Sequence, residues 1–269
     1  MTNPLCTYIL WRIRKNKNAL IIWNGSTGSG KTYACISQCV EIAEKTGTHF
    51  SIADNLDFNF TGLLRKMNLP INAKPGTNFI FEEVGITGGG GSNREWQSKI
   101  NRLFFTFLQT ARYRNQVLHF TCPNFSFLDK GSRSLVHLQM VADGIDFKKM
   151  LSNWKPYILQ TNMTTGKTYF KHLRIFVDGD MAVIDRIRYS MPSQNILEEY
   201  EREKKKYLDT LIKDTQQEDK IVKQKAPMPV NKIRGMLQRG FTVYEIAKSL
   251  GRAQQPVGYW AKKIRAGII

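Results

Sequence analysis

The stretch Gly25-Ser26-Thr27-Gly28-Ser29-Gly30-Lys31-Thr32 decides the fold of this chain. It matches the pattern G-x-x-x-x-G-K-[ST] over its full length, follows the apolar run Ala19–Trp23 and opens a helical pattern. In such a loop, backbone N–H groups point at phosphate oxygens, the lysine reaches the β- and γ-phosphates, and the final hydroxyl serves Mg²⁺. A strand-to-helix turn that binds nothing is the alternative, which the full match disfavours. The sequence therefore predicts that these eight residues bind ATP, with Thr32 as a Mg²⁺ ligand.

A pair of acids follows roughly 50 residues later, at the end of another apolar run. Asn78–Phe81 reads as a buried strand, and Glu82 and Glu83 come directly after it. Nucleotide hydrolysis needs one carboxylate in the Mg²⁺ shell and another group that polarises the attacking water. We predict the first role for Glu82, where most families have Asp, and the second for Glu83. A merely solvated strand end is the alternative.

Composition and charge narrow the class of protein. With 269 residues, 42% of them hydrophobic, the chain is long enough for one large domain and a small appendage. Its formal net charge of +18 points to a polyanionic partner, either nucleic acid or an anionic membrane surface. No stretch reaches the roughly 20 apolar residues of a spanning helix, and the N-terminus lacks the charge order of a signal peptide. We therefore expect a cytoplasmic protein with no membrane segment and nucleic acid as its partner.

The cysteines and histidines carry no metal-site pattern. None of the four cysteines is spaced as in C-x-x-C, and Cys35 and Cys39 lie one helical turn apart behind the phosphate-binding loop. We predict reduced core thiols for all four, including Cys6 and Cys122, because free cysteine is among the most buried residue types. The four histidines are scattered, and none is assigned a ligand role.

Residues 18–146 alternate short apolar runs with helical patterns, which predicts an α/β fold with a mainly parallel sheet. The predicted strands are 19–23, 50–53, 78–81, 117–121 and 136–141. The predicted helices are 31–44 and 94–112. Residues 154–187 read as β-hairpins that decorate the sheet edge, with a turn at 164–167. The first domain is expected to span residues 1–196.

The remaining sequence divides into a linker and a small unit. Residues 197–229 are highly charged and end at Pro227 and Pro229, which predicts a charged helical linker. Residues 230–269 predict a small all-α domain with helices at 230–237, 243–250 and 254–264. Thr242 is the expected N-cap of its second helix. This small domain has eight basic residues against one acidic residue, Glu245, a formal net charge of +7.

The segment Gly240–Gly251, followed by Val257 and Ile264, resembles the helix-turn-helix of resolvases and repressors. Ala247 is small where two helices cross, and Gly251 opens the turn. The resemblance implies that the third helix presents amides, an aromatic ring and lysines to a DNA groove: Gln254, Gln255, Tyr259, Lys262 and Lys263. A three-helix lid or a protein-docking module is the alternative.

Four segments follow the acids in order: Ser92–Trp96, Leu108–Asn115, Val117–Pro123 and Leu128–Arg133. Taken with the phosphate-binding loop, this ordered set resembles the FtsK/HerA superfamily of DNA-pumping ATPases. The likeness is greatest to its zonular occludens toxin-like and viral DNA-packaging branch. It implies a RecA-like P-loop NTPase domain that works as a homo-oligomeric ring, with a hexamer as the expected size. Thr121 stands where a polar sensor, often Gln, is found. The arginine that completes a neighbouring subunit's site has three candidates, Arg112, Arg114 and Arg133.

Three functions are compatible with these motifs. The first is an ATP-driven motor that moves double-stranded DNA for packaging or transfer, with the C-terminal domain holding the DNA. The second is a nucleotide-gated DNA-binding regulator or helicase-loader-like accessory ATPase with slow turnover. The third is an adaptor ATPase that acts on protein. The paired acids and the arginines favour the motor. Because toxin-like phage proteins of this group carry a membrane segment, extrusion of a filamentous phage is not predicted.

Overall fold

A computed structural model describes residues 2–82, 114–128, 130–162, 164–177, 179–224, 229–252 and 254–268. The chain forms two compact units, Met1–Leu211 and Ile212–Ile269, which are considered separately. The predicted helix at 94–112 lies outside the described residues, as do two predicted site residues, Glu83 and Arg112.

A single sheet organises the larger unit. Of the strands in the described part of the chain, eight run in the order β2-β3-β4-β1-β5-β6-β7-β8, and β9 also pairs with β6. The pairs from β2 to β5 are parallel, and the pairs from β5 onward are antiparallel. The bounds are β1 Ala19–Asn24, β2 Leu56–Asp57, β3 Asn78–Phe81, β4 Val117–Cys122, β5 Leu138–Asp146, β6 Leu151–Thr161, β7 Thr168–Val177, β8 Asp180–Ile184 and β9 Ile187–Ser190. The predicted parallel core and hairpins are confirmed.

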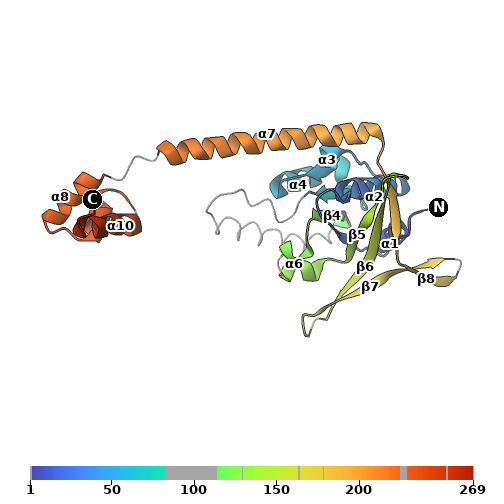
Figure 1. The fold of residues 1–269 in the computed structure, drawn as a ribbon. Coiled ribbons are helices and arrows are strands. Elements are labelled where there is room, and N and C mark those ends of the chain that lie inside the picture. The colour runs from blue at the N-terminus through green and yellow to red at the C-terminus, as the bar shows by residue number, and fades with distance from the viewer. Residues whose placement is uncertain are drawn as a thin grey trace. The chain divides into compact units, whose positions relative to one another are not determined.

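Helices cover both faces of the parallel half. They are α1 Pro4–Arg14, α2 Lys31–Thr46, α3 Ile52–Asn55, α4 Phe60–Met67, α6 Lys130–Leu135 and α7 Gln194–Gln224, with 3-10 turns η1 Pro70–Asn72 and η3 Phe125–Phe127. Every residue of β1 is buried, as in a strand packed on both sides. Ile21 packs with α1 and α2 in one core, and Ile22 packs with α4 in the other. Figure 1 shows β6, β7 and β8 reaching past the helix-covered half.

Two predicted strands need correction. Residues 50–53 form no strand: the short helix α3 starts at Ile52, and the strand beside β3 is β2 at 56–57. The Ser51 hydroxyl accepts a hydrogen bond from the Asp54 N–H and caps α3. The strand predicted at 136–141 begins two residues later and continues to Asp146, because β6 pairs with it along that length. Helix α1 had no counterpart in the sequence analysis.

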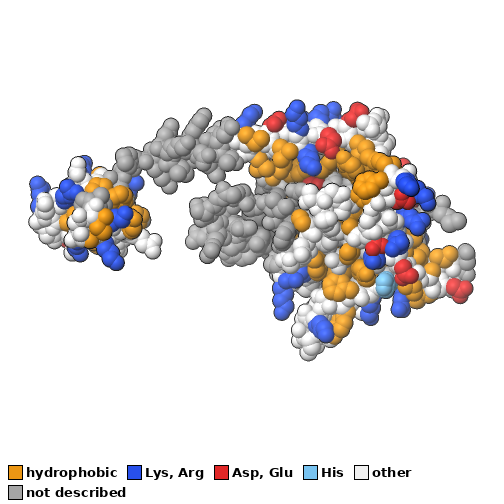
Figure 2. All heavy atoms as spheres, viewed as in Figure 1, with side chains coloured by type: hydrophobic (Ala, Val, Ile, Leu, Met, Phe, Trp, Pro, Cys, Tyr) orange, Lys and Arg blue, Asp and Glu red, His pale blue; other side chains and the backbone are white. Residues whose placement is uncertain are grey.

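The smaller unit has the three predicted helices, α8 Val230–Gln238, α9 Val243–Ser249 and α10 Gln254–Arg265. Thr242 caps α9 as predicted: its hydroxyl accepts from the Glu245 N–H, while the Glu245 carboxylate accepts from the Thr242 N–H. A core of Ile233, Ile246, Ala247, Val257 and Ala261 joins the helices. In Figure 2 the visible face of this unit carries Lys and Arg side chains, consistent with its net charge. Whether it is a helix-turn-helix that binds DNA stays a prediction.

No helix in the described ranges has the length and apolar character needed to cross a bilayer.

Candidate nucleotide-binding site

The phosphate-binding loop joins the end of β1 to the start of α2. Gly28 and Gly30 have positive φ angles of 79° and 77°, which suit glycine. Gly30 is the N-cap of α2, and because it has no side chain, the first turn of the helix carries no side-chain cap. A Cβ atom on Gly25 would lie 2.5 Å from Ser29 Oγ and 2.7 Å from Ala142 Cβ. The glycines therefore serve both the backbone conformation and close packing against β5.

Lys31 and Ser29 are placed as a phosphate site requires. Lys31 Nζ donates to the carbonyl oxygens of Gly25 and Ser26, both at 2.9 Å, so the ammonium group lies over the loop. The Ser29 hydroxyl is buried and has no hydrogen-bond partner within the described part of the protein. A buried polar group without a partner is rare, and a bound phosphate oxygen would satisfy it. These observations fit the predicted role of the loop.

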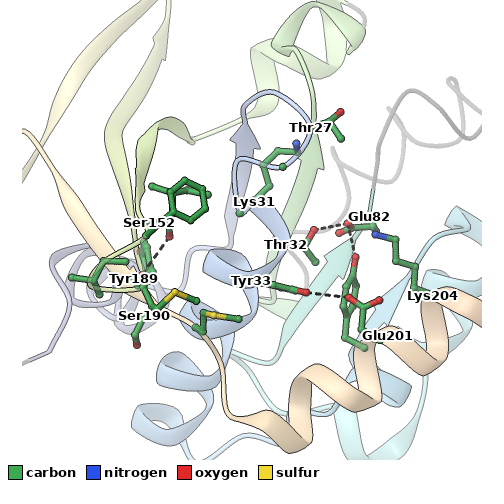
Figure 3. Close-up of a pocket in the computed structure, with 18 of the residues that line it drawn as sticks. Thr27, Lys31, Thr32, Tyr33, Glu82, Ser152, Tyr189, Ser190, Glu201 and Lys204 are labelled. Atoms are coloured by element: carbon green, nitrogen blue, oxygen red, sulfur yellow. Dashed lines mark hydrogen bonds between the residues drawn. The ribbon is translucent and has the colours of Figure 1, made fainter.

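Glu82 lies at the centre of a network of hydroxyl groups. It is 3% exposed and follows β3 directly. Its Oε1 accepts from Thr32 Oγ1 at 2.5 Å (Figure 3). Its Oε2 accepts from Thr121 Oγ1 at 3.0 Å. Thr32 and Glu82 thus bring a hydroxyl and a carboxylate together beside the loop. Hard oxygen ligands of this kind suit Mg²⁺, so the two predicted metal-binding residues fit that ion.

The strand order explains how Thr121 reaches this network. Strand β4 lies between β1 and β3, with Trp23 opposite Thr121 and Phe81 opposite Phe120. The carboxyl ends of the three parallel strands therefore meet at one edge of the sheet. Asn24 of β1 links both neighbouring strands at this edge. Its amide donates to Cys122 Sγ of β4 at 2.7 Å, and its Oδ1 accepts from Gln139 of β5 at 2.8 Å. Burial raises the pKa of Cys122 to about 12, so it stays a thiol.

Helix α7 supplies site residues that sequence reasoning missed. Tyr200 is buried, and its hydroxyl donates to Glu82 Oε1 at 3.2 Å. The Tyr33 hydroxyl donates to Glu201 at 3.1 Å, and the Ala53 N–H donates to Glu199 at 2.9 Å. Helix α7 therefore runs along α2 and α3 (Figure 1). Tyr200 falls in the segment 197–229, which the sequence predicted only as a charged helical linker, and no local signal links it to an acid 118 residues away.

All four cysteines are free and buried, as predicted. Cys35, Cys39 and His119 form a buried cluster whose ligand atoms lie within 4.8 Å of one another. The ring of His119 is already committed, because Trp23 Nε1–H donates to its Nδ1 at 3.2 Å. An indole nitrogen only donates, so His119 Nε2 carries the proton and is not a metal ligand in this arrangement. The cluster is part of the hydrogen-bonded core behind the loop.

The remaining predicted residues make contacts of their own within each unit. Arg114 donates to the carbonyl of Met67 at 2.8 Å, and Arg133 lies over the Phe125 ring at 6.0 Å. Neither observation tests a role in a neighbouring subunit. In the smaller unit, Gln254, Gln255, Tyr259 and Lys262 are exposed on α10 and Lys263 is half-buried, with its ammonium 4.8 Å from the centre of the Tyr259 ring. Their predicted contact with DNA stays a prediction.

Comparison with known proteins adds little to this geometry. No protein-family model matches the chain, and no curated protein matches it in sequence. Among solved structures, the N-terminal domain of zonular occludens toxin from Neisseria meningitidis matches with a TM-score of 0.33 and 14% identity. The match covers 58% of this chain and 95% of that domain. So distant a likeness carries no conclusion, and membership of the FtsK/HerA superfamily stays a prediction.

Proposed function

We propose that this chain is an ATPase that hydrolyses ATP at the loop formed by Gly25–Thr32. The observation that carries the proposal is the 2.5 Å hydrogen bond between Thr32 and the buried Glu82. It brings the last residue of the phosphate-binding loop onto a carboxylate at the end of a separate strand. In P-loop NTPases, Mg²⁺ is held by the Ser or Thr of the phosphate-binding loop together with an acidic residue on a neighbouring strand.

Each residue has a role that follows from its chemistry. Loop N–H groups and Lys31 hold the phosphates and offset their negative charge. Thr32 and Glu82 would hold Mg²⁺, which neutralises charge on the β- and γ-phosphates when bound. Thr121 and Tyr200 orient Glu82 through its two oxygens. Glu83, next in sequence, is the proposed base that takes a proton from the attacking water.

Two substitutions test this proposal. Lys31→Ala removes the cation that faces the phosphates, and we expect loss of hydrolysis and much weaker ATP binding. Glu83→Gln removes the base but keeps the shape of the side chain, so we expect ATP binding without hydrolysis. The measurements are phosphate release and ATP binding on the same preparations. Hydrolysis at the parental rate in Glu83→Gln would assign the base elsewhere, with Glu82 the next candidate.

We further propose that ATP hydrolysis moves double-stranded DNA through a homo-oligomeric ring, with a hexamer as the expected size. The net charge of +18, of which +7 lies in residues 230–269, supports a polyanionic partner. A ring places an arginine of one subunit, here Arg112, Arg114 or Arg133, against the nucleotide of the next. Hydrolysis that is slow and unaffected by DNA in a monomer would instead favour a nucleotide-gated DNA-binding regulator.

Mixed subunits test the ring. A Lys31→Ala subunit keeps its arginines, and an arginine variant keeps its loop. Mixing the two inactive proteins should restore part of the hydrolysis, because some interfaces then combine an intact loop with an intact arginine. No recovery with any of the three arginine variants would contradict an arginine acting between subunits.

A further inference from the structure

The cavity beside the phosphate-binding loop has two chemically different ends. It encloses about 420 Å³ and borders Lys31 and Thr32. One end is polar and is lined by Glu82, Tyr200, Glu201 and Lys204. The other end is lined mainly by apolar side chains from the β5–β6 turn, the strand ends that flank it and the segment after β9: Ile145, Phe147, Met150, Leu151 and Met191. In Figure 3 the loop residues Lys31 and Thr32 lie between Glu82 and Glu201 on one side and Ser152 and Tyr189 on the other.

We propose that the apolar end is a nucleobase site in which the ring of Phe147 stacks on the base of the bound nucleotide. This inference rests on the proposed ATPase function, because the phosphates must occupy the loop for the base to lie at this end. A nucleobase is flat, with large π faces, and aromatic side chains are its commonest stacking partners. The polar end holds Glu82, which would bind the metal, and the Tyr200 hydroxyl that donates to it. The base therefore takes the opposite end.

The β5–β6 turn lies within reach of a nucleotide held by the loop. Its two strands pack directly on the loop, since a Cβ on Gly30 would lie 3.6 Å from Ser152 Cβ and 3.8 Å from Ile145 Cδ1. Ala142 of β5 packs still more closely on Gly25. One ribose is all that separates the base from the phosphates in a nucleotide. The apolar side chains on this turn are the surfaces that the base meets beyond the loop.

Phe147 is held out from the protein by a structured turn. The Asp146 side chain accepts hydrogen bonds from the N–H groups of Lys148 and Lys149, both at 3.1 Å. Met150 closes the turn with a φ of 51°. The side chain of Phe147 is consequently 76% exposed although it borders the cavity. A phenyl ring so exposed gains apolar contact when a base stacks on it.

The apolar end has few side-chain hydrogen-bonding groups that could distinguish one nucleobase from another. Ser152, whose Cβ would lie 3.6 Å from a Cβ on Gly30, accepts from Trp154 Nε1–H at 3.0 Å and donates to the carbonyl of Tyr189 at 3.4 Å. Tyr189 donates its own hydroxyl to Gln38 at 2.5 Å. Stacking without such contacts discriminates weakly between bases. We expect the Kd values for ATP and GTP to agree within about tenfold.

The test measures the contribution of the nucleobase to binding separately from that of the phosphates. Titration calorimetry with the full chain would compare Mg²⁺–ATP with inorganic tripolyphosphate, which has the phosphates and no base. Phe147→Ala should weaken ATP binding roughly tenfold, as loss of one stacked ring does. Binding of tripolyphosphate should not change. Phe176→Ala is the matched control, because Phe176 is a 70% exposed phenylalanine of β7 outside the cavity lining.

A second variant gives a spectroscopic readout. Phe147→Trp keeps an aromatic ring, so it should bind ATP with near-parental affinity, and ATP should quench its added fluorescence while tripolyphosphate does not. Equal weakening of both ligands by Phe147→Ala, or no weakening of ATP, would overturn the nucleobase site and leave the ATPase proposal standing. Failure of the unmodified protein to bind either ligand would instead overturn both proposals.

Discussion

Tyr200 lies outside the phosphate-binding loop and donates a hydrogen bond to the carboxylate of Glu82. Burial raises the pKa of Tyr200, and the charge of Glu82 raises it further, so the hydroxyl keeps its proton and remains a donor. Tyr200→Phe removes that donor but keeps the ring, which lies 6.1 Å from the Tyr33 ring centre. A hydrogen bond to a charged group contributes about 1.5–3 kcal/mol. We expect hydrolysis to slow by about tenfold or more, and half-maximal activity to need more Mg²⁺.

The measurement is kcat as a function of Mg²⁺ concentration. Tyr157→Phe is a suitable control, because Tyr157 lies on β6 and does not line the cavity. If Tyr200→Phe has parental kcat and parental Mg²⁺ dependence, Tyr200 contributes packing alone.

We expect the titration of a single residue, His137, to make the free energy of unfolding depend on pH. Its Nδ1 accepts a hydrogen bond from the Leu20 N–H at 3.0 Å. Burial, with the positive charges of Arg12 and Lys17, lowers the pKa of His137 from 6.5 to about 3. The unfolded chain therefore binds a proton below pH 6.5 that the folded chain does not bind until about pH 3. The free energy of unfolding should fall as the pH falls through this window, by up to about 1.4 kcal/mol per pH unit from this group. Above pH 6.5 the group contributes no pH dependence.

His137→Asn keeps an acceptor for the Leu20 N–H and does not titrate. Urea unfolding at several pH values on both sides of 6.5 should show a shallower loss of stability in acid than the parental chain shows. An identical slope in His137→Asn and the parental chain would assign the pH dependence to other groups.

At the scale of elements, α7 is held against the nucleotide site by one face. Tyr207 stacks on Phe58 with ring centres 4.7 Å apart and an angle of 11° between the rings. This contact lies about two helical turns beyond Tyr200 on α7. Aromatic pairs of this kind contribute about 1 kcal/mol beyond their buried area. Tyr207→Ala should speed hydrogen exchange in residues 200–211 by roughly fivefold and lower the rate of hydrolysis through Tyr200.

Leu208→Ala is the matched control, since Leu208 is the next residue of α7 and is 47% exposed. Alanine has a higher helix propensity than either leucine or tyrosine, so faster exchange in either variant would not come from lost helix propensity. Equal exchange rates in the two variants would show that the stack does not hold α7.

At the scale of the whole molecule, we expect the larger unit to hydrolyse ATP and residues 230–269 to bind DNA. Each residue proposed to act at the nucleotide site, Phe147 and Tyr200 included, precedes Lys225, and the residues proposed to contact DNA bases lie in α10. A chain truncated after Lys225 should keep its basal hydrolysis but bind DNA more weakly. A plot of the logarithm of the DNA association constant against the logarithm of the salt concentration has a negative slope. The magnitude of that slope falls by about 1 for each DNA phosphate that the protein no longer neutralises. Anisotropy titrations of both chains at several salt concentrations measure that slope. An unchanged slope with hydrolysis abolished would make residues 230–269 a structural or oligomerisation unit.

The amino-acid sequence by itself determined the elements whose causes are local. The glycine pattern of 25–32, the apolar runs that became β1, β3 and β4, and the capping residue Thr242 all act over a few neighbouring residues. The segment 50–53 was wrongly predicted as a strand, because the hydrogen bonds that define its fold also involve distant groups: Asn55 donates to the Asn72 side chain and to the carbonyl of Asn78.

Only the tertiary structure decided which side chains meet at the site. The insertion of β4 between β1 and β3 brings Thr121 onto Glu82, and the docking of α7 brings Tyr200 onto the same carboxylate. The β5–β6 pairing carries Phe147 to the cavity. Thr121 and Tyr200 are separated from Glu82 by 39 and 118 positions along the chain. The periodicity of apolar residues indicates whether a segment forms a helix or a strand, because it depends on neighbouring residues alone. The order of the strands and the docking of the helices depend on the free energy of packing the whole unit, so local patterns do not give them.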